Sequence, residues 1–198
     1  LEPFRVTESN LVVHGGLLMP WHELCEIGLV LVNQKTLEIV EKRDWKVKVL
    51  NPDPERITAK AREVSGFNEN DWRDAVPLEE ALREYVKKTA GAVFAAHNVT
   101  YDWGMISVAL ARYGIESKMD YHRIDTWSWA VAILNSKGHF LPSYNLSKLC
   151  KFLGLGEEPM PHRAINGAIK AYEVFKAVRS LPVAKPPDDQ PEPVHRCC

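Results

Sequence analysis

The sequence lacks a surplus of positive charge: across its 198 residues the formal net charge at pH 7 is −1. The broad basic face with which many proteins bind duplex DNA is therefore not indicated, although a few lysines and metal ions can still hold a nucleic acid locally. No apolar run approaches the roughly 18 residues that span a bilayer, and residues 1–10 lack the basic and apolar regions of a signal peptide. We expect no membrane association and a cytoplasmic location.

Cysteines are also few. Cys25 and Cys150 lie singly in apolar stretches, while Cys197 and Cys198 are adjacent at the end of the sequence. This spacing matches neither a disulfide framework nor a paired-cysteine zinc site. Proline, by contrast, collects in residues 182–198, PVAKPPDDQPEPVHRCC, which we interpret as a flexible tail. Residues 1–181 are long enough to form one domain with a sizeable core.

Hydrophobic patterning predicts strands first and helices later. Two β-favouring runs, joined by the turn sequence NQKT, occupy residues 24–33 and 37–50. A short buried strand is expected in GAVFAA, and YHRID is a short segment between predicted helices. Helices are expected over residues 58–65, 77–89, 102–113, 126–134, 143–154 and 162–178. This order predicts an α/β domain in which helices flank a mixed sheet.

Residues of the types found in active sites occur in three segments, each at the beginning of a predicted helix. These segments are HNVTYD at 97–102, RIDTWSWA at 123–130 and PHRAINGA at 161–168. Together with ELCEIGLVLV near the start, this order resembles the DEDDh 3'-5' exonucleases of the DnaQ and RNase T superfamily. The resemblance covers about residues 4–180. It implies a ribonuclease H-like fold, with a five-stranded mixed sheet, for the domain at 1–181.

The resemblance also implies a two-metal site. In that family four acidic residues hold two Mg²⁺ or Mn²⁺ ions around the scissile phosphate, and a histidine acts as general base for the attacking water. Asp102 matches the acid of the second motif and His162 the general base of the third. His97 and Asn98, which precede Asp102, are candidates for substrate binding.

Two departures from the family pattern weaken that metal site. Gly167 stands where the third motif should have its acid. The first motif has two possible registers. One places Leu11 and Val13 at both acid positions, and the other retains Glu8 as the glutamate. The candidate metal ligands are therefore Asp102 and Glu8, at most two of the four carboxylates in the family pattern. We expect impaired hydrolysis, because fewer carboxylates bind divalent cations more weakly.

Other assignments remain open at this stage. Gly16 and Leu17, in the sequence HGGLL, correspond to a family loop that approaches the terminal nucleotide, but the glycines can equally serve a turn. His14 or Asn166 could substitute for a lost ligand. Trp127 and Trp129 lie two apart on different faces of a predicted helix, so one of them is expected in the core, and stacking of the other on a base stays open.

The motif residues also have structural interpretations. Asp102 could simply cap a helix that starts at Tyr101, and Asp125 is expected to cap the helix that starts at Thr126. His162 could be a turn histidine that follows a proline. Glu26 is interpreted as a structural strand residue.

Three functions compete on these observations. The first is metal-dependent hydrolysis of single-stranded 3' ends of DNA or RNA, with impaired catalysis. The second is a catalytically inactive pseudo-exonuclease that binds such ends. The third is a protein scaffold. Because members of the family are often dimeric or embedded in larger complexes, the resemblance further suggests a homodimer or a subunit of a larger assembly.

Overall fold

The N-terminal part of the fold is an antiparallel hairpin. The computed structural model describes residues 24–49 and 59–184, and all structural statements concern these residues. β1 (Glu26–Val32) pairs with β2 (Ile39–Lys46), with Glu26 opposite Lys46 and an irregularity near Val32. The Asn33 side chain accepts hydrogen bonds from the backbone of Lys35 and Thr36 at 2.9 and 3.1 Å, which closes the predicted turn.

A first hydrophobic core lies between this hairpin and two helices, α2 (Leu78–Lys88) and α3 (Val99–Arg112). α2 repeats apolar residues at helical spacing, with acids in its first turn and lysines in its last, so one face packs inward. A short helix, α1 (Ala59–Ser65), precedes it. The buried members of this core are Ile27, Trp45, Val47, Leu78, Ala81, Leu82, Tyr85, Val86, Ile106, Ala109 and Leu110.

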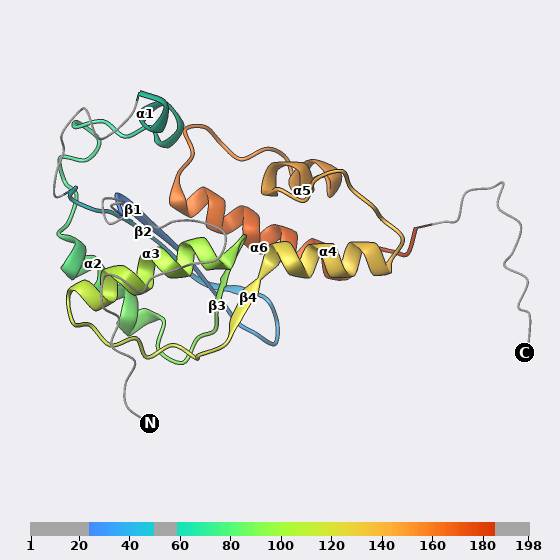
Figure 1. The fold of residues 1–198 in the computed structure, drawn as a ribbon, viewed down its shortest axis with the longest axis horizontal. Coiled ribbons are helices and arrows are strands. Elements are labelled where there is room, and N and C mark those ends of the chain that lie inside the picture. Colours follow the sequence, from blue (N-terminus) through green and yellow to red (C-terminus); the bar gives the residue numbers. More distant parts are fainter. Residues whose placement is uncertain (1–23, 50–58, 185–198) are drawn as a thin grey trace, which may run out of the picture.

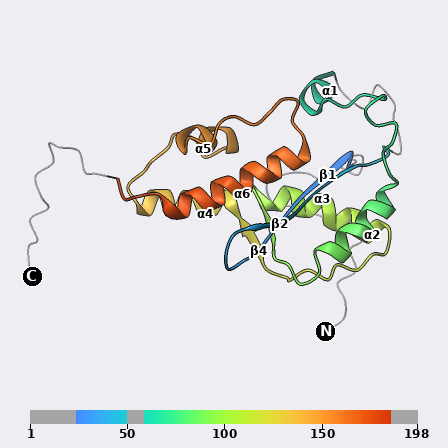
Figure 2. The ribbon, with the colours of Figure 1, turned by 180° about the vertical axis from the view of Figure 1, so that it is seen from behind.

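A second core joins the C-terminal helices. α4 (Thr126–Ser136) and α6 (Ala164–Ser180) run side by side, and α5 (Leu146–Phe152) packs on α6 (Figures 1 and 2). The start of α6 lies against β1, so this helix connects the two cores. The buried members of the second core are Ala130, Leu134, Leu149, Cys150, Val174 and Val178.

The α/β class predicted from the sequence is confirmed, whereas a five-stranded sheet is not. Within the described ranges, β1 pairs with β2, and β3 (Phe94–Ala96) pairs in parallel with β4 (Arg123–Asp125), giving two two-stranded sheets. An isolated parallel bridge joins Val47 to Val76. None of the helices in this part of the chain has the length and apolar character needed to cross a membrane. The division into a domain at 1–181 and a tail at 182–198 stays a prediction.

The start of α3 differs from the prediction, and the difference bears on Asp102. The helix begins at Val99, three residues before the predicted start, with Asn98 as its N-cap residue. Asn98 has a φ of +67°, a left-handed conformation that asparagine tolerates better than most residues. Asp102 therefore lies inside the first turn, and the interpretation of this aspartate as a helix cap is wrong.

Candidate active site

Asp102 and His162 come from different segments of the chain, and the charge of His162 affects the pKa of Asp102. Asp102 is carried by the first turn of α3, and His162 lies two residues before the start of α6. Loss of hydration raises the pKa of the Asp102 carboxyl group, while its own backbone N–H and the charge of His162 act to lower it. Asp102 remains exposed, so water limits the size of this shift. The charge of His162 thus acts on Asp102, and a joint catalytic role for the two residues stays a prediction.

Asp125 holds the beginnings of α3 and α4 together. Its Oδ1 accepts hydrogen bonds from Trp127 N at 3.2 Å and from Asn98 N at 2.9 Å, and its Oδ2 accepts from Ser128 Oγ at 2.7 Å. The predicted cap of α4 is confirmed. Because α3 has no side-chain cap from its own N-cap residue, the same carboxylate also serves that helix.

Removal of the Asp125 carboxylate is expected to destabilise the protein. Asp125→Ala should lower the free energy of unfolding at pH 7 by about 2–3 kcal/mol, because it leaves N–H groups of two helices without an acceptor. Chemical denaturation measures the change. Asp74→Ala, at an exposed aspartate, is the matched control and should change stability by less than about 0.5 kcal/mol.

The effect of Asp125→Ala should also depend on pH. Burial tends to raise the pKa of Asp125, but hydrogen bonds from Ser128, Asn98, Trp127 and Val99 outweigh it and hold the pKa below its usual value. A depressed pKa in the folded state means that the stabilisation is complete above about pH 4 and is lost as pH falls further. The difference between the wild type and Asp125→Ala should therefore shrink in acid. A difference that stays constant down to about pH 2 contradicts this assignment.

His97 and Asn98, predicted to bind substrate, occupy the turn between β3 and α3. His97 is half-buried, and its Nδ1 lies 3.3 Å from the hydroxyl of Thr126. Burial lowers the pKa of His97, which favours a neutral ring, while the charge of Asp125 acts to raise it. Asn98 is exposed and lies four residues before Asp102. Contact of either residue with substrate stays a prediction.

A buried ion pair anchors the segment that carries His162. Arg163 Nε lies 3.0 Å from Glu26 Oε1 on β1, and Glu26 Oε2 accepts a hydrogen bond from Ala164 N at 3.0 Å. The side chain of Glu26 is only 6% exposed. Burial and the nearby Asp44 carboxyl group raise the pKa of Glu26, against the effects of Ala164 and Arg163. The Arg163 guanidinium also lies over the Trp72 ring, 4.6 Å from its centre. Glu26 is therefore a structural residue, as the sequence indicated.

Gly28 on β1 allows the beginning of α6 to approach closely. A Cβ atom at this position would lie 2.3 Å from the carbonyl carbon of Ala164 and 2.3 Å from the backbone nitrogen of Ile165. Only a residue without a side chain fits there. This contact and the Glu26–Arg163 ion pair together determine where His162 lies relative to the hairpin.

The region around Gly167 contains a carboxylate that the sequence did not single out. Glu158, in the loop between α5 and α6, places its Oε1 2.7 Å from His162 Nδ1. A Cβ atom on Gly167 would be 3.4 Å from His162 Cε1 and 3.7 Å from Glu158 Oε1. The Glu158 carboxylate thus lies close to the space that an acidic side chain at position 167 would enter.

The side chains of the described residues do not form a site for two divalent cations. Within residues 24–49 and 59–184, no group of three or more His, Cys, Asp or Glu side chains is arranged to hold a metal ion. Gly167 offers no side-chain donor, and Glu158 is engaged by His162. Glu8, Gly16 and Leu17, together with the alternative register at Leu11 and Val13, lie outside the described residues. The metal-binding role of Asp102 therefore stays a prediction.

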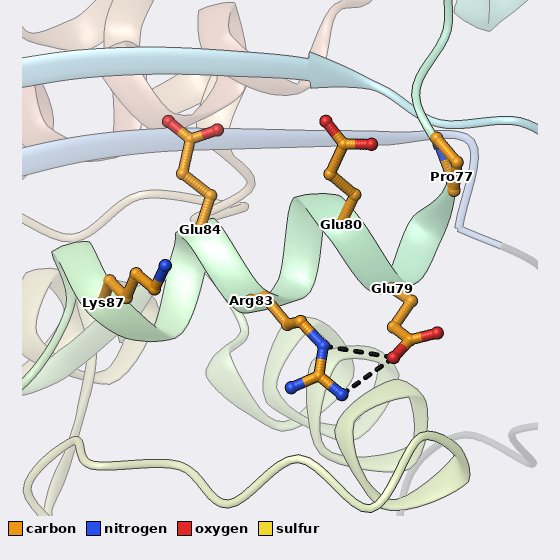
Figure 3. A pocket seen from close by; sticks show the side chains of 6 residues that line it. All are labelled: Pro77, Glu79, Glu80, Arg83, Glu84 and Lys87. Atoms are coloured by element: carbon orange, nitrogen blue, oxygen red, sulfur yellow. Dashed lines mark hydrogen bonds and ion pairs between the residues drawn. The ribbon is translucent and has the colours of Figure 1, made fainter.

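A shallow hollow on the surface of α2 lies elsewhere and contains none of the motif residues (Figure 3). Arg83 and Glu79 form an ion pair across one helical turn there, at 2.8 Å. The alternating charges of this helix face are typical of a solvated surface. The residues that line it are Pro77, Glu79, Glu80, Arg83, Glu84 and Lys87.

Two contacts of the site were missed from the sequence. The pairing of Arg163 with Glu26 joins the third motif to the EIG segment, and the pairing of Glu158 with His162 joins a loop acid to the predicted base. The only sequence signal for the second was spacing, since an acid four residues before a histidine is a common helical pattern. Here the two residues lie in a loop, so that pattern did not apply.

Comparison with known proteins supports the family resemblance. A family model described as exonuclease, RNase T, matches residues 16–175. The chain is 28% identical to a DNA polymerase III PolC-type protein of Staphylococcus saprophyticus over 167 residues, 84% of this chain and 11% of that protein. A protein of the same description from Thermotoga maritima is 28% identical over 154 residues, 77% of this chain and 10% of that protein. The chain thus spans about a tenth of the length of these curated relatives.

Proposed function

The chain belongs to the RNase T exonuclease family, as the sequence resemblance indicated, and from that premise we propose that it binds single-stranded 3' ends of nucleic acid and hydrolyses them only slowly. One observation carries the proposal. The third motif has its histidine, His162, but Gly167 stands where that motif needs a further carboxylate. This combination supports a proposal in which the base remains and the cation site is weakened.

In this proposal His162 acts as the general base. One ring nitrogen removes a proton from a water molecule, and the water oxygen forms a bond to the phosphorus at the 3' end. The bond between that phosphorus and the 3' oxygen of the preceding nucleotide breaks, and the leaving oxygen takes a proton from solvent. The product is a nucleoside 5'-monophosphate. Members of the family use divalent metal ions, and the shortage of carboxylates here weakens the binding of such ions, which is why we propose slow hydrolysis.

DNA is the first substrate to test. The curated relatives are described as DNA polymerase III PolC-type proteins, and this chain corresponds to about a tenth of each. An interaction with DNA is consistent with the net charge of −1 if the end is bound locally, with few phosphate contacts. RNA of the same sequence is the parallel substrate.

The test combines a binding assay and a cleavage assay on one oligonucleotide labelled at its 5' end. We expect anisotropy at low salt to rise with protein concentration and the affinity to fall as salt increases. With Mn²⁺ and excess protein, the strand should shorten slowly from its 3' end. A flat anisotropy titration defeats the binding proposal. Shortening at catalytic protein concentrations within seconds defeats the proposal of slow hydrolysis.

His162→Ala should reduce the rate of this shortening by about 100-fold, because it removes the proposed base. Binding should change by less than about twofold, since the base contributes to the transition state rather than to end binding. His122→Ala is the matched control: this exposed histidine pairs with Asp120, on the loop before β4. Equal rates for the two variants would show that His162 has no catalytic role.

Binding without hydrolysis is the second candidate function. It is favoured by the lack of a three-donor metal group within the described ranges. The same assay separates the two candidates, because a binding domain retains the anisotropy signal but gives no product above a buffer blank. Association with a second copy or with a larger complex stays a prediction.

A further inference from the structure

A short segment that follows α1 contacts the residues on either side of His162 in the sequence. This supporting segment, residues 66–72, packs against Pro161, which precedes His162, and against Arg163, which follows it. The loop that carries the third motif comes close to the end of α1 (Figure 1). Because both neighbours of the predicted base are contacted, the supporting segment restrains the backbone from which the His162 side chain projects.

Gly66 makes the contact with Pro161. This glycine has a φ of +64°, in the left-handed region that favours glycine. A Cβ atom at position 66 would lie 2.5 Å from Pro161 Cγ and 2.6 Å from Pro161 Cβ. Any side chain at this position would therefore displace the proline ring. The absence of a side chain allows the backbone of the supporting segment to touch the residue before His162.

Trp72 makes the contact with Arg163 and ties it to the hairpin. The Arg163 guanidinium lies 4.6 Å from the centre of the Trp72 ring, and Lys46 Nζ, on β2, lies 5.0 Å from it. The indole N–H donates a hydrogen bond to the carbonyl oxygen of Cys25 at 2.9 Å, directly before β1. Lys46 Nζ also donates to the carbonyl oxygen of Asp71 at 2.9 Å. A cation over the face of tryptophan is attracted by the ring electrons, so Trp72 connects the third motif to β1 and β2.

The burial of Trp72 limits how it can affect cleavage. Only 7% of the residue is exposed, and its ring packs on that of Phe67, with 4.9 Å between the ring centres. A buried ring does not reach a bound strand. Any effect of Trp72 on hydrolysis therefore passes through Arg163 to the adjacent His162.

We propose that Gly66 and Trp72 are positioning residues, through which the supporting segment keeps His162 in the place from which it reaches the bound 3' end. This inference rests on the proposed function, because the position of His162 affects hydrolysis only if this residue acts as a base. A small misplacement of a catalytic group lowers the rate strongly. Because the base contributes to the transition state, loss of the support should lower the cleavage rate and leave strand affinity nearly unchanged.

The mobility of the His162 backbone tests the support independently of any activity. ¹⁵N relaxation of the His162 amide should give an order parameter of about 0.85 in the wild type, the value of rigid backbone. In Trp72→Leu it should fall below about 0.6, which is typical of flexible backbone. An unchanged order parameter in Trp72→Leu overturns the inference.

Phe67→Leu is the matched control for Trp72→Leu. It removes an aromatic ring from the same buried cluster, but the cation over the Phe67 ring is Arg62, at 5.5 Å, rather than a residue of the third motif. The order parameter of the His162 amide should therefore stay at about 0.85 in this variant. Equal falls in the two variants would indicate a general loosening of the cluster and would overturn the inference.

The cleavage assay connects the support to the base. Trp72→Leu and Gly66→Ala should each slow the shortening of the oligonucleotide by about 10- to 100-fold, while the affinity measured by anisotropy changes by less than about twofold. Trp72→Phe keeps an aromatic ring for Arg163 and should stay within about threefold of the wild type. Gly66→Ala leaves the buried cluster intact, so it tests the proposal even if Trp72→Leu does not fold. Wild-type cleavage rates in folded Trp72→Leu and Gly66→Ala overturn the positioning role.

Failure of this inference is distinguishable from failure of the proposed function. If the wild type gives no product, the proposed hydrolysis fails, and the catalytic purpose of the support fails with it. The order parameter of the His162 amide then still shows whether the supporting segment holds the third motif in place.

Discussion

Gly28→Ala is expected to lower the free energy of unfolding by more than about 4 kcal/mol, or to prevent folding. The added methyl group would lie 2.3 Å from backbone atoms of both Ala164 and Ile165. A flexible side chain could move away from such a clash, but the backbone at the beginning of a helix cannot move without displacing the helix. Separation of α6 from β1 would also pull Arg163 away from Glu26 and leave that buried carboxylate unpaired.

Thermal and urea denaturation measure this effect. Gly167→Ala is the matched control, because it makes the same chemical change at a position where the nearest atom to the new methyl group is 3.4 Å away. That control should be neutral or stabilising by about 0.5–1 kcal/mol, since glycine is a poor residue within a helix. If Gly28→Ala proves as stable as this control, the close packing of β1 against α6 is wrong.

Gly167→Asp is expected to raise Mn²⁺-dependent shortening of the oligonucleotide by about 100- to 1,000-fold. The substitution supplies the carboxylate that the third motif lacks, and stabilisation of the transition state by a bound cation is worth several kcal/mol. The aspartate would start 3.7 Å from Glu158 Oε1, so a cation between the two carboxylates would also relieve their repulsion. Titration with Mn²⁺, followed by its paramagnetic effect on solvent water, should show tighter binding.

Gly167→Ala again serves as the control, because it removes the helix glycine without adding oxygen donors. Chelation of the metal should return Gly167→Asp to the rate of the wild type without metal. If Gly167→Asp and Gly167→Ala bind Mn²⁺ equally weakly and give equal rates, the shortage of carboxylates at position 167 is not what limits this protein.

Local features of the fold were predictable because their causes are local. The run at residues 24–33 contains β1, and the amphipathic pattern with terminal acids and bases identified α2. The cap at Asp125 followed from an aspartate placed directly before a helical pattern. The start of α3 was misplaced by three residues, because its N–H groups are capped by Asp125 from another segment rather than by a residue of its own.

The candidate site also has parts that the sequence predicted and parts that it did not. The presence of His162 and Asp102 and the glycine at 167 could be read directly from the motif spacing. The contacts of Glu26 and Glu158 could not be predicted, because they depend on how β1 and a loop pack against the segment that begins α6. A two-stranded pairing of β3 with β4 likewise depends on segments that are distant in the sequence.

The sequence by itself therefore determined the family, the order of the elements and the missing acid, since each is a matter of residue type and spacing along the chain. Tertiary structure alone decided which charged groups face each other: Arg163 with Glu26, and His162 with Glu158. The physical reason is that electrostatic and hydrogen-bond energies depend on distances of a few ångström between atoms, and only packing brings those atoms together.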